Sequence, residues 1–142
     1  MSFIIFLILF FSIGAVDHEI PLQITIDNVR SDKGIITVSV FLDQESFEAE
    51  KPFLNRSFPK LDHVEGDIYT CSIDLPEGIY GIVVLDDENS DLNMNYNWMG
   101  IPKEGYGFSN FIHKGFSKPI YSDFDFELNA QSQEMNITLR YF

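Results

Sequence analysis

The sequence predicts an all-β fold, a single antiparallel β-sandwich of about seven strands with one long ordered loop. The first observation behind this prediction is that apolar and polar residues alternate along several segments, as in strands with one buried face. The second is that no segment carries the period of about 3.6 residues that marks a long helix. The third is composition: 45% of the 142 residues are hydrophobic and 15% are aromatic, enough for a packed core. A strand with one polar, solvent-exposed face must bury its apolar face, so we expect two sheets packed face to face.

Two strands are predicted near the start of the globular part, at 21–29 and 36–42, where apolar residues occupy every second position. Between them, 30–34 reads Arg-Ser-Asp-Lys-Gly, a short polar turn that ends in Gly34. Glycine tolerates the positive φ that tight turns require. We therefore expect the two strands to form a hairpin.

The middle of the chain is less regular. Residues 44–60 mix charged residues, aromatic rings and proline, and we expect a loop there with one short helical turn near 45–50. A strand is predicted at 67–74 and contains Cys71, the only cysteine. The domain therefore has no internal disulfide, and we expect this thiol to be a small buried group rather than a reactive one.

The turn Leu75-Pro76-Glu77-Gly78 leads into a nearly all-apolar segment at 79–85, the pattern of a central strand. The order Pro-x-Gly-x-Tyr ends at Tyr80 and resembles the corner of Greek-key sandwiches, where a tyrosine hydroxyl bonds to nearby backbone. We therefore expect an immunoglobulin-like or transthyretin-like Greek key. The last two strands are predicted at 123–128 and 136–141, which ties the C-terminus into a sheet.

The N-terminus has the pattern of an export signal. Residues 1–16 carry no charge, and the apolar run at 3–11 is followed by small residues. We expect residues 1–16 to be a signal peptide, cleaved between Gly14 and Asp17, and 17–142 to be one β-sandwich domain. A buried strand or an uncleaved anchor is the alternative, but a membrane span needs roughly 20 apolar residues. The sequence thus predicts an exported protein, periplasmic or extracellular, with no membrane span after cleavage.

The charge balance limits the partners. There are 9 Lys and Arg against 22 Asp and Glu, a net charge of −13. Nucleic acid and anionic membranes bind basic surfaces, so neither is expected as a partner. An unknown protein or glycan of the cell envelope is the expected partner class, and the acidity is compatible with cation binding or with simple solubility.

Residues 86–121, called the insert below, show no sustained period, although loops beyond roughly 12–15 residues are uncommon in compact domains. Its first part places oxygen-bearing side chains at every second position, in Asp87, Asn89, Asp91 and Asn93. Ca²⁺ takes oxygen ligands from carboxylates, amides and carbonyls, so this spacing predicts a Ca²⁺ site. The alternative is a solvated acidic turn, because Asn and Asp are common in turns.

The aromatic segment at 96–111 also has two interpretations. In the first, Trp98, Tyr106 and Phe108 form a ligand-binding platform for a sugar or peptide. In the second, the segment packs its own aromatic rings onto the open end of the sandwich. Its three glycines and one proline, over 97–110, favour a folded loop over a strand.

The sequence carries no recognisable catalytic motif. The three histidines are scattered, and there is no G-x-S-x-G elbow, phosphate-binding loop or zinc pattern. We expect a non-enzymatic module with no cofactor other than Ca²⁺. A carbohydrate-binding or carbohydrate-acting protein is the alternative, since carboxylate pairs of the kind that glycosidases use are plentiful in so acidic a chain.

Four blocks carry a resemblance to a known family. In chain order they are Val29-Arg30-Ser31-Asp32-Lys33-Gly34, Leu75-Pro76-Glu77-Gly78-Ile79-Tyr80, Asp87-Glu88-Asn89 and Gly100-Ile101-Pro102-Lys103-Glu104-Gly105-Tyr106-Gly107-Phe108-Ser109-Asn110. Together they resemble the exported bacterial family known as domain of unknown function 2141. The resemblance implies an exported β-sandwich with no assigned activity, in a bacterial envelope or its surroundings. Members often carry glycines in the acidic loop where this chain has Ser90 and Leu92.

Overall fold

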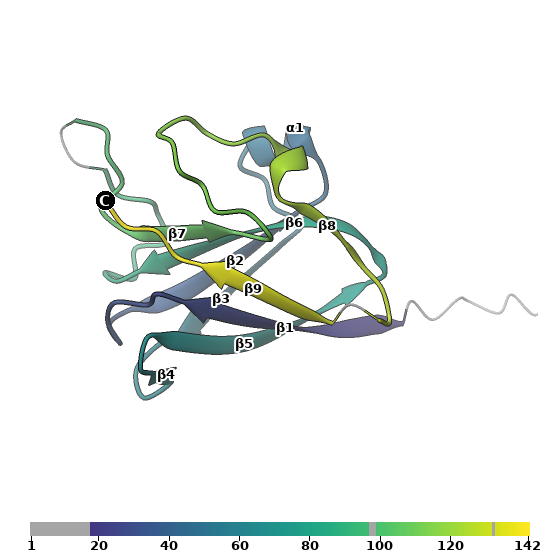
Figure 1. The fold of residues 1–142 in the computed structure, drawn as a ribbon, viewed down its shortest axis with the longest axis horizontal. Helices are drawn as coiled ribbons and strands as arrows, with labels where there is room; N and C mark the ends of the chain where they lie inside the picture. Colours follow the sequence, from purple (N-terminus) through teal and green to yellow (C-terminus); the bar gives the residue numbers. More distant parts are fainter. Residues whose placement is uncertain (1–17, 97–98, 132) are drawn as a thin grey trace, which may run out of the picture.

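The structure is a computed structural model that describes residues 18–96, 99–131 and 133–142. Within these residues the strands form two sheets, and two short helical segments lie between strands along the chain (Figure 1). The elements are β1 (Glu19–Asp27), β2 (Ile35–Phe41), α1 (Gln44–Glu48), β3 (Leu54–Pro59), β4 (Val64–Glu65), β5 (Ile68–Pro76), β6 (Gly78–Asp87), β7 (Gly105–Phe108), the 3-10 helix η1 (Tyr121–Asp123), β8 (Asp125–Leu128) and β9 (Glu134–Thr138). The all-β prediction is confirmed. The signal peptide expected at 1–16 lies outside the described residues.

Among the described residues, none of the helices has the length and apolar character needed to cross a bilayer.

The first sheet has the strand order β4-β5-β1-β9, and the second has β3-β2-β6-β7 with β8 also paired to β6. Because β1 and β2 belong to different sheets, the hairpin predicted for 21–29 and 36–42 is wrong. The segment between them is not a tight turn: Asn28 adopts a left-handed φ of 61°, and the N–H of Val29 donates to Asp67 O at 2.9 Å. These contacts lead the chain from one sheet to the other.

One strand pair departs from the predicted antiparallel arrangement. β9 runs parallel to β1, with Gln23 opposite Glu134 and Asp27 opposite Thr138. The preceding strand, β8, pairs with β6 in the second sheet, so the chain crosses between sheets before β9 and arrives in the direction of β1. The C-terminal segment is tied down as expected, because Leu139 N–H donates to Asp27 O at 3.0 Å.

Sequence reasoning missed three strands. β3 lies inside 44–60, which was expected to be a loop, and as an edge strand it shows a mostly exposed pattern with no clear alternation. β4 is two residues long. β7 lies inside the insert, and its sequence Gly-Tyr-Gly-Phe is buried at every position, so it has no period of two. The short helical turn near 45–50 is confirmed as α1.

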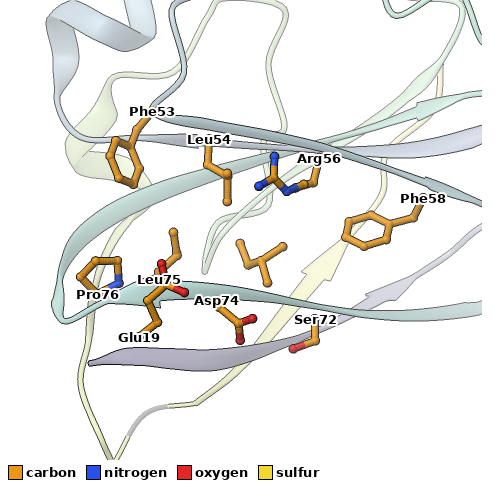
Figure 2. A pocket seen from close by; sticks show the side chains of 10 residues that line it. Glu19, Phe53, Leu54, Arg56, Phe58, Ser72, Asp74, Leu75 and Pro76 are labelled. Carbon is orange, nitrogen blue, oxygen red and sulfur yellow. The ribbon is translucent and has the colours of Figure 1, made fainter. Parts of the chain in front are cut away.

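An open cleft of about 370 Å³ lies between the edges of the two sheets, where β3 faces β5 (Figure 2). Arg56 from β3 and Asp74 from β5 lie on opposite walls, and Leu54 and Phe58 supply apolar surface. The cleft exists because β4 pairs only with the first two residues of β5, which leaves most of that strand's outer edge uncovered.

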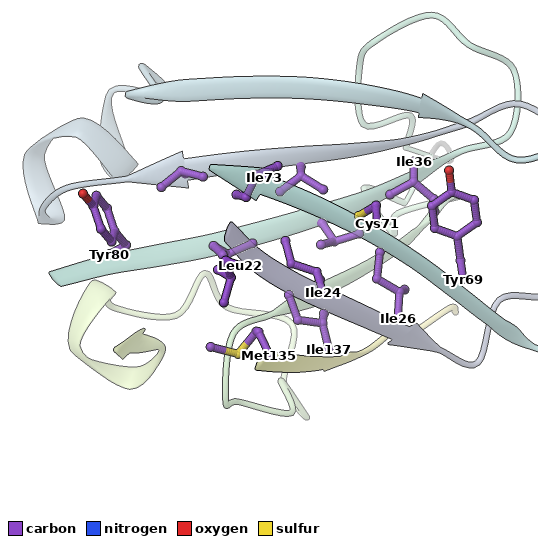
Figure 3. Packing of buried hydrophobic residues seen from close by; sticks show 14 of the residues in the cluster. Leu22, Ile24, Ile26, Ile36, Tyr69, Cys71, Ile73, Tyr80, Met135 and Ile137 are labelled. Carbon is purple, nitrogen blue, oxygen red and sulfur yellow. The ribbon is translucent and has the colours of Figure 1, made fainter. Parts of the chain in front are cut away.

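The main core lies between the two sheets (Figure 3). Along β1 and β5 of the first sheet, residues that face this core alternate with outward-facing ones, as a sheet buried on one face requires. The predicted tyrosine corner forms at its edge, where Tyr80 Oη donates to Pro76 O at 2.8 Å. Cys71 is buried here as expected, and burial raises the pKa of its thiol to about 12.

A second apolar cluster covers the other face of the second sheet. It contains Phe41, Phe47, Tyr106, Phe108, Tyr121 and Phe124. These residues come from β2, α1, β7, η1 and the position just after η1, so the cluster fastens α1 and the end of the insert to the sheet (Figure 1). β6 is thereby covered on both faces, which explains why its sequence is almost continuously apolar.

Candidate metal and ligand site in the insert

The insert returns to the sheet it leaves. β7 pairs with β6 antiparallel, from Asp86 opposite Gly105 to Val83 opposite Phe108. The described residues between the two strands, 88–96 and 99–104, belong to an arm that is anchored at both ends, and Lys103 N–H donates to Asn95 O across it at 2.7 Å. The arm is therefore held to the second sheet at both ends.

The polar turn at the start of the arm is folded by side chain to backbone hydrogen bonds. Asp87 is fully buried, and its carboxylate accepts the N–H groups of Asp91 at 3.1 Å and Leu92 at 2.6 Å. Asp91 is exposed and accepts from Asn93 N–H at 2.9 Å and from Asn95 Nδ2 at 2.8 Å. Such local bonds hold Asp and Asn turns in shape.

Glu104 brings a third carboxylate to this turn. It immediately precedes β7, is 5% exposed, and accepts Asn95 N–H at 3.3 Å. One oxygen each from Asp87, Asp91 and Glu104 lies within 4.8 Å of the other two. We call these residues the carboxylate cluster. Its chemistry, several carboxylate oxygens around one point, suits a hard cation such as Ca²⁺.

The pKa values of two carboxylates in the cluster are shifted in opposite directions. Burial raises the pKa of Glu104, and the charges of Asp87 and Asp91 raise it further, against hydrogen bonds from Asn95. The pKa of Asp91 is lowered, first by the hydrogen bond from Asn95 and then by the N–H of Asn93. Three carboxylates this close repel one another, and a bound cation would remove that cost.

All four predicted ligands lie in this turn, two of them with carboxylates and two with amides. Asp87 and Asp91 belong to the cluster, whereas Asn89 and Asn93 bond to Asp91 itself. Asn89 Oδ1 accepts Asp91 N–H at 3.1 Å, and Asn93 Nδ2 donates to Asp91 O at 2.8 Å. Sequence reasoning missed Glu104 because it lies far along the chain, beyond the reach of any local spacing.

The backbone of the turn is strained at two places. Ser90 and Leu92 adopt left-handed φ angles of 57° and 64°. Only glycine takes such angles without cost, and a bulky side chain does so rarely. These are the two positions where the resembled family tends to have glycine.

The two acidic residues on either side of Asp87 form ion pairs with basic side chains. Arg30 pairs with Glu88 at 2.5 Å, and Ser31 Oγ donates to the same carboxylate at 2.9 Å. Burial pushes the pKa of Glu88 up, but the hydrogen bonds from Arg30 and Ser31 outweigh it and leave the pKa below its ordinary value. Deeper in the sheet, Lys60 forms an ion pair with Asp86, and both side chains are fully buried.

A groove of about 540 Å³ runs along the outer face of the second sheet beside the arm. Its aromatic lining consists of Phe41, Phe47, Tyr96, Tyr106, Phe108, Phe116 and Phe142. Tyr106 and Phe108, two of the predicted platform residues, form its floor and are only 8% and 6% exposed. The third, Trp98, lies outside the described residues.

The rings that present open surface are different ones. Phe116 is 77% exposed, Tyr96 57% and Phe142 42%. Phe142 stacks on Phe116 and on Tyr106, with ring centroids 5.1 and 6.1 Å apart. Sequence reasoning did not select Phe116 and Phe142, because they lie in separate segments that only the fold brings together.

The comparisons with known proteins give one positive finding. A model of a bacterial family, described as "Uncharacterized protein conserved in bacteria (DUF2141)", matches residues 24–136. The matched region runs from β1 into β9 and includes the whole insert. The comparisons with curated proteins and with solved structures found no match.

Proposed function

This chain belongs to the bacterial family known as domain of unknown function 2141, and from that premise we propose that it is an exported, non-enzymatic binding or structural module of the cell envelope. Its place of action would be the periplasm or the outside of the cell. The uncharged apolar start of the sequence supports export. The lack of a recognisable catalytic motif in the sequence supports a non-enzymatic role.

The proposed architecture is an immunoglobulin-like or transthyretin-like Greek-key sandwich. The hydrogen bond from Tyr80 to Pro76 supports it, because such corners recur in Greek-key sandwiches. The arrangement of the sheets supports it as well. The two sheets share one core, and the chain crosses from the first sheet to the second between β1 and β2.

The proposed role of the insert is to bind Ca²⁺ through the carboxylate cluster, and one observation carries this proposal. Oxygens of Asp87, Asp91 and Glu104 lie within 4.8 Å of one another, although the first and last are almost fully buried. Ca²⁺ usually takes about 6–8 oxygen ligands. Side-chain amide oxygens and backbone carbonyls of the same turn, including those of Asn89 and Asn93, would complete this number around the three carboxylates. A cation there would join the start of the arm to β7 and stiffen the groove wall.

Thermal unfolding of the purified chain in calcium and in chelator tests this role. Ligand at about 100 times its Kd adds about 2.7 kcal/mol to the free energy of unfolding, which raises the Tm of a domain of this size by several degrees. We expect that rise in calcium and not with an equal ionic strength of sodium chloride. No rise in calcium would refute the proposal.

The matched variants are Glu104→Gln and Glu127→Gln. The first removes one charge of the cluster while keeping its shape, and should abolish the calcium-dependent rise. The second neutralises an exposed acid on β8 and should keep the rise. Asp87 is left intact, because its carboxylate accepts two backbone N–H groups and its loss would unfold the turn whether or not calcium binds.

The second candidate function is recognition or processing of a carbohydrate in the aromatic groove. The exposed faces of Phe116, Phe142 and Tyr96 favour it, since sugar rings stack on open aromatic faces. Trp98 is the only tryptophan and lies two residues after Tyr96 in the sequence, so its fluorescence is the signal to follow during titration with cell-envelope glycans. A saturable change that Phe116→Ala abolishes would support this function, and a flat response across the glycans would exclude it.

A further inference from the structure

The ion pair between Lys60 and Asp86 is sealed from solvent. Lys60 directly follows β3, Asp86 lies in β6, and both side chains are 0% exposed. Lys60 Nζ donates to Asp86 Oδ1, while Tyr141 Oη donates to Asp86 Oδ2 at 2.6 Å. Burying two charges costs more than their attraction commonly returns, so such a pair calls for a role beyond simple stabilisation.

The surroundings hold the pair in one geometry. Asp86 sits between Ile36 of β2 and Gly105 of β7 in the sheet. Lys60 N–H donates to Gly34 O at 3.1 Å, which fixes the start of its side chain. Tyr141 packs on Gly105, the β7 residue paired with Asp86, so closely that a Cβ on this glycine would be 2.3 Å from a ring carbon.

Arg30 covers Tyr141 from outside. Its guanidinium carbon lies 4.4 Å from the centre of the Tyr141 ring, and its own carboxylate partner is Glu88. Arg30 N–H also donates to the Tyr141 hydroxyl at 3.3 Å. The hydroxyl that bonds Asp86 is therefore held from the other side, and water is kept away from the pair.

We propose that Lys60 and Asp86 condense to form an intramolecular amide bond between Nζ and Cγ. A proton first passes from the ammonium group to Oδ1 within the pair. The neutral amine then attacks Cγ, and the negative charge that develops on Oδ2 is stabilised by the Tyr141 hydroxyl. The Cγ–Oδ1 bond breaks as a second nitrogen proton moves to Oδ1, which leaves as water.

The balance of this step needs no other reactant. One ammonium and one carboxylate become one amide and one water, with no change of oxidation state. Fixed proximity supplies the driving force, since well-oriented groups in one molecule reach effective concentrations of about 10⁵–10⁸ M. Exclusion of water from the site also protects the amide from hydrolysis.

The bond would change how the domain is held together. Cys71 is the only cysteine, so a disulfide within the chain is impossible. An amide between Lys60 and Asp86 would join the end of the edge strand β3 covalently to the central strand β6. It would also fix the strand from which the insert departs.

Peptide mapping of the full wild-type chain tests the proposal without any variant. Trypsin cleaves after Lys and Arg, and none of these residues lies between Lys60 and Lys103. An unmodified chain yields separate peptides 57–60 and 61–103. The bonded chain yields one peptide, 57–103, lighter than its sequence by one water, with Lys60 uncleaved. We expect the single lighter peptide, and peptide 61–103 as the main product would overturn the proposal.

Three variants test the chemistry. Asp86→Asn should give the same bonded peptide with loss of ammonia in place of water, whereas Lys60→Arg should give none. Tyr141→Phe removes the hydroxyl that contacts the reacting carboxyl, and should slow bond formation in freshly synthesised chain at least tenfold. An unchanged rate in Tyr141→Phe would overturn the role given to this hydroxyl, and a bonded peptide from Lys60→Arg would show that another residue reacts.

Discussion

Replacing Phe124 by alanine should weaken the attachment of the insert more than any surface change. Phe124 is fully buried in the second cluster, with ring centroids 5.0 Å from those of both Phe47 and Phe108. Its loss removes a whole buried ring and leaves a cavity between α1, β7 and η1. For buried Phe→Ala changes the free energy of unfolding falls by about 3–5 kcal/mol. Because domains of this kind are stable by about 5–15 kcal/mol, the variant should still fold.

Urea unfolding followed by circular dichroism measures this loss, with Phe116→Ala as the matched control. Phe116 is 77% exposed, so its truncation should change the free energy of unfolding by less than about 0.5 kcal/mol. Amide hydrogen exchange should show the loss of protection first in β7. A change below about 1 kcal/mol in Phe124→Ala, or equal effects of the two variants, would refute the view that this cluster holds the insert.

Three further predictions concern single sites. Tyr80→Phe removes the corner hydrogen bond and should lower the free energy of unfolding in urea by about 1 kcal/mol; no change would mean that the corner bond contributes nothing. Gly107→Ala would place a methyl group 2.6 Å from Ile137 and should cost about 1–3 kcal/mol, whereas Gly115→Ala meets nothing closer than 3.9 Å and should be nearly neutral. Hydrogen bonds at the start of α1 lower the pKa of Asp43, so its stabilising effect is present above the ordinary pKa and is lost as the pH falls through the lowered one. The stability difference between wild type and Asp43→Asn should therefore shrink in acid, and a constant difference would contradict this assignment.

Local patterns in the sequence predicted much of the fold. Alternation located β1, β2, β5, β8 and β9, and an apolar run located β6 as a central strand. The Pro-x-Gly-x-Tyr order predicted the hydrogen bond of Tyr80. The four sequence blocks identified the family, which the match over 24–136 confirms. Each of these signals is carried by neighbours in the chain, so it can be read without the structure.

Pairing between strands could not be predicted in the same way. The turn at 30–34 suggested a hairpin, but the apolar faces of β1 and β2 oppose each other across the core, so the strands belong to different sheets. β7 escaped notice because both its faces are buried: Tyr106 and Phe108 lie in the second cluster, and the opposite face packs against Ile137 and Tyr141. Burial on both faces removes the alternation that identifies a strand.

The candidate site was predicted in part for the same reason. Asp87 and Asp91 lie close in sequence and were recognised from their spacing, while Glu104 reaches them only because β7 returns alongside β6. The buried pair of Lys60 and Asp86 gave no signal at all. Lys60 lies in a segment expected to be a loop, and only the pairing of the edge strand β3 with β2 brings it to Gly34 and to Asp86 of β6.

A crystal structure grown in calcium would test the role of the insert most directly. The proposal predicts an anomalous density peak bound by oxygens of Asp87, Asp91 and Glu104, at the distances of about 2.3–2.6 Å that are usual for Ca²⁺. Carboxylates that stay apart around water, with no such peak at saturating calcium, would contradict it.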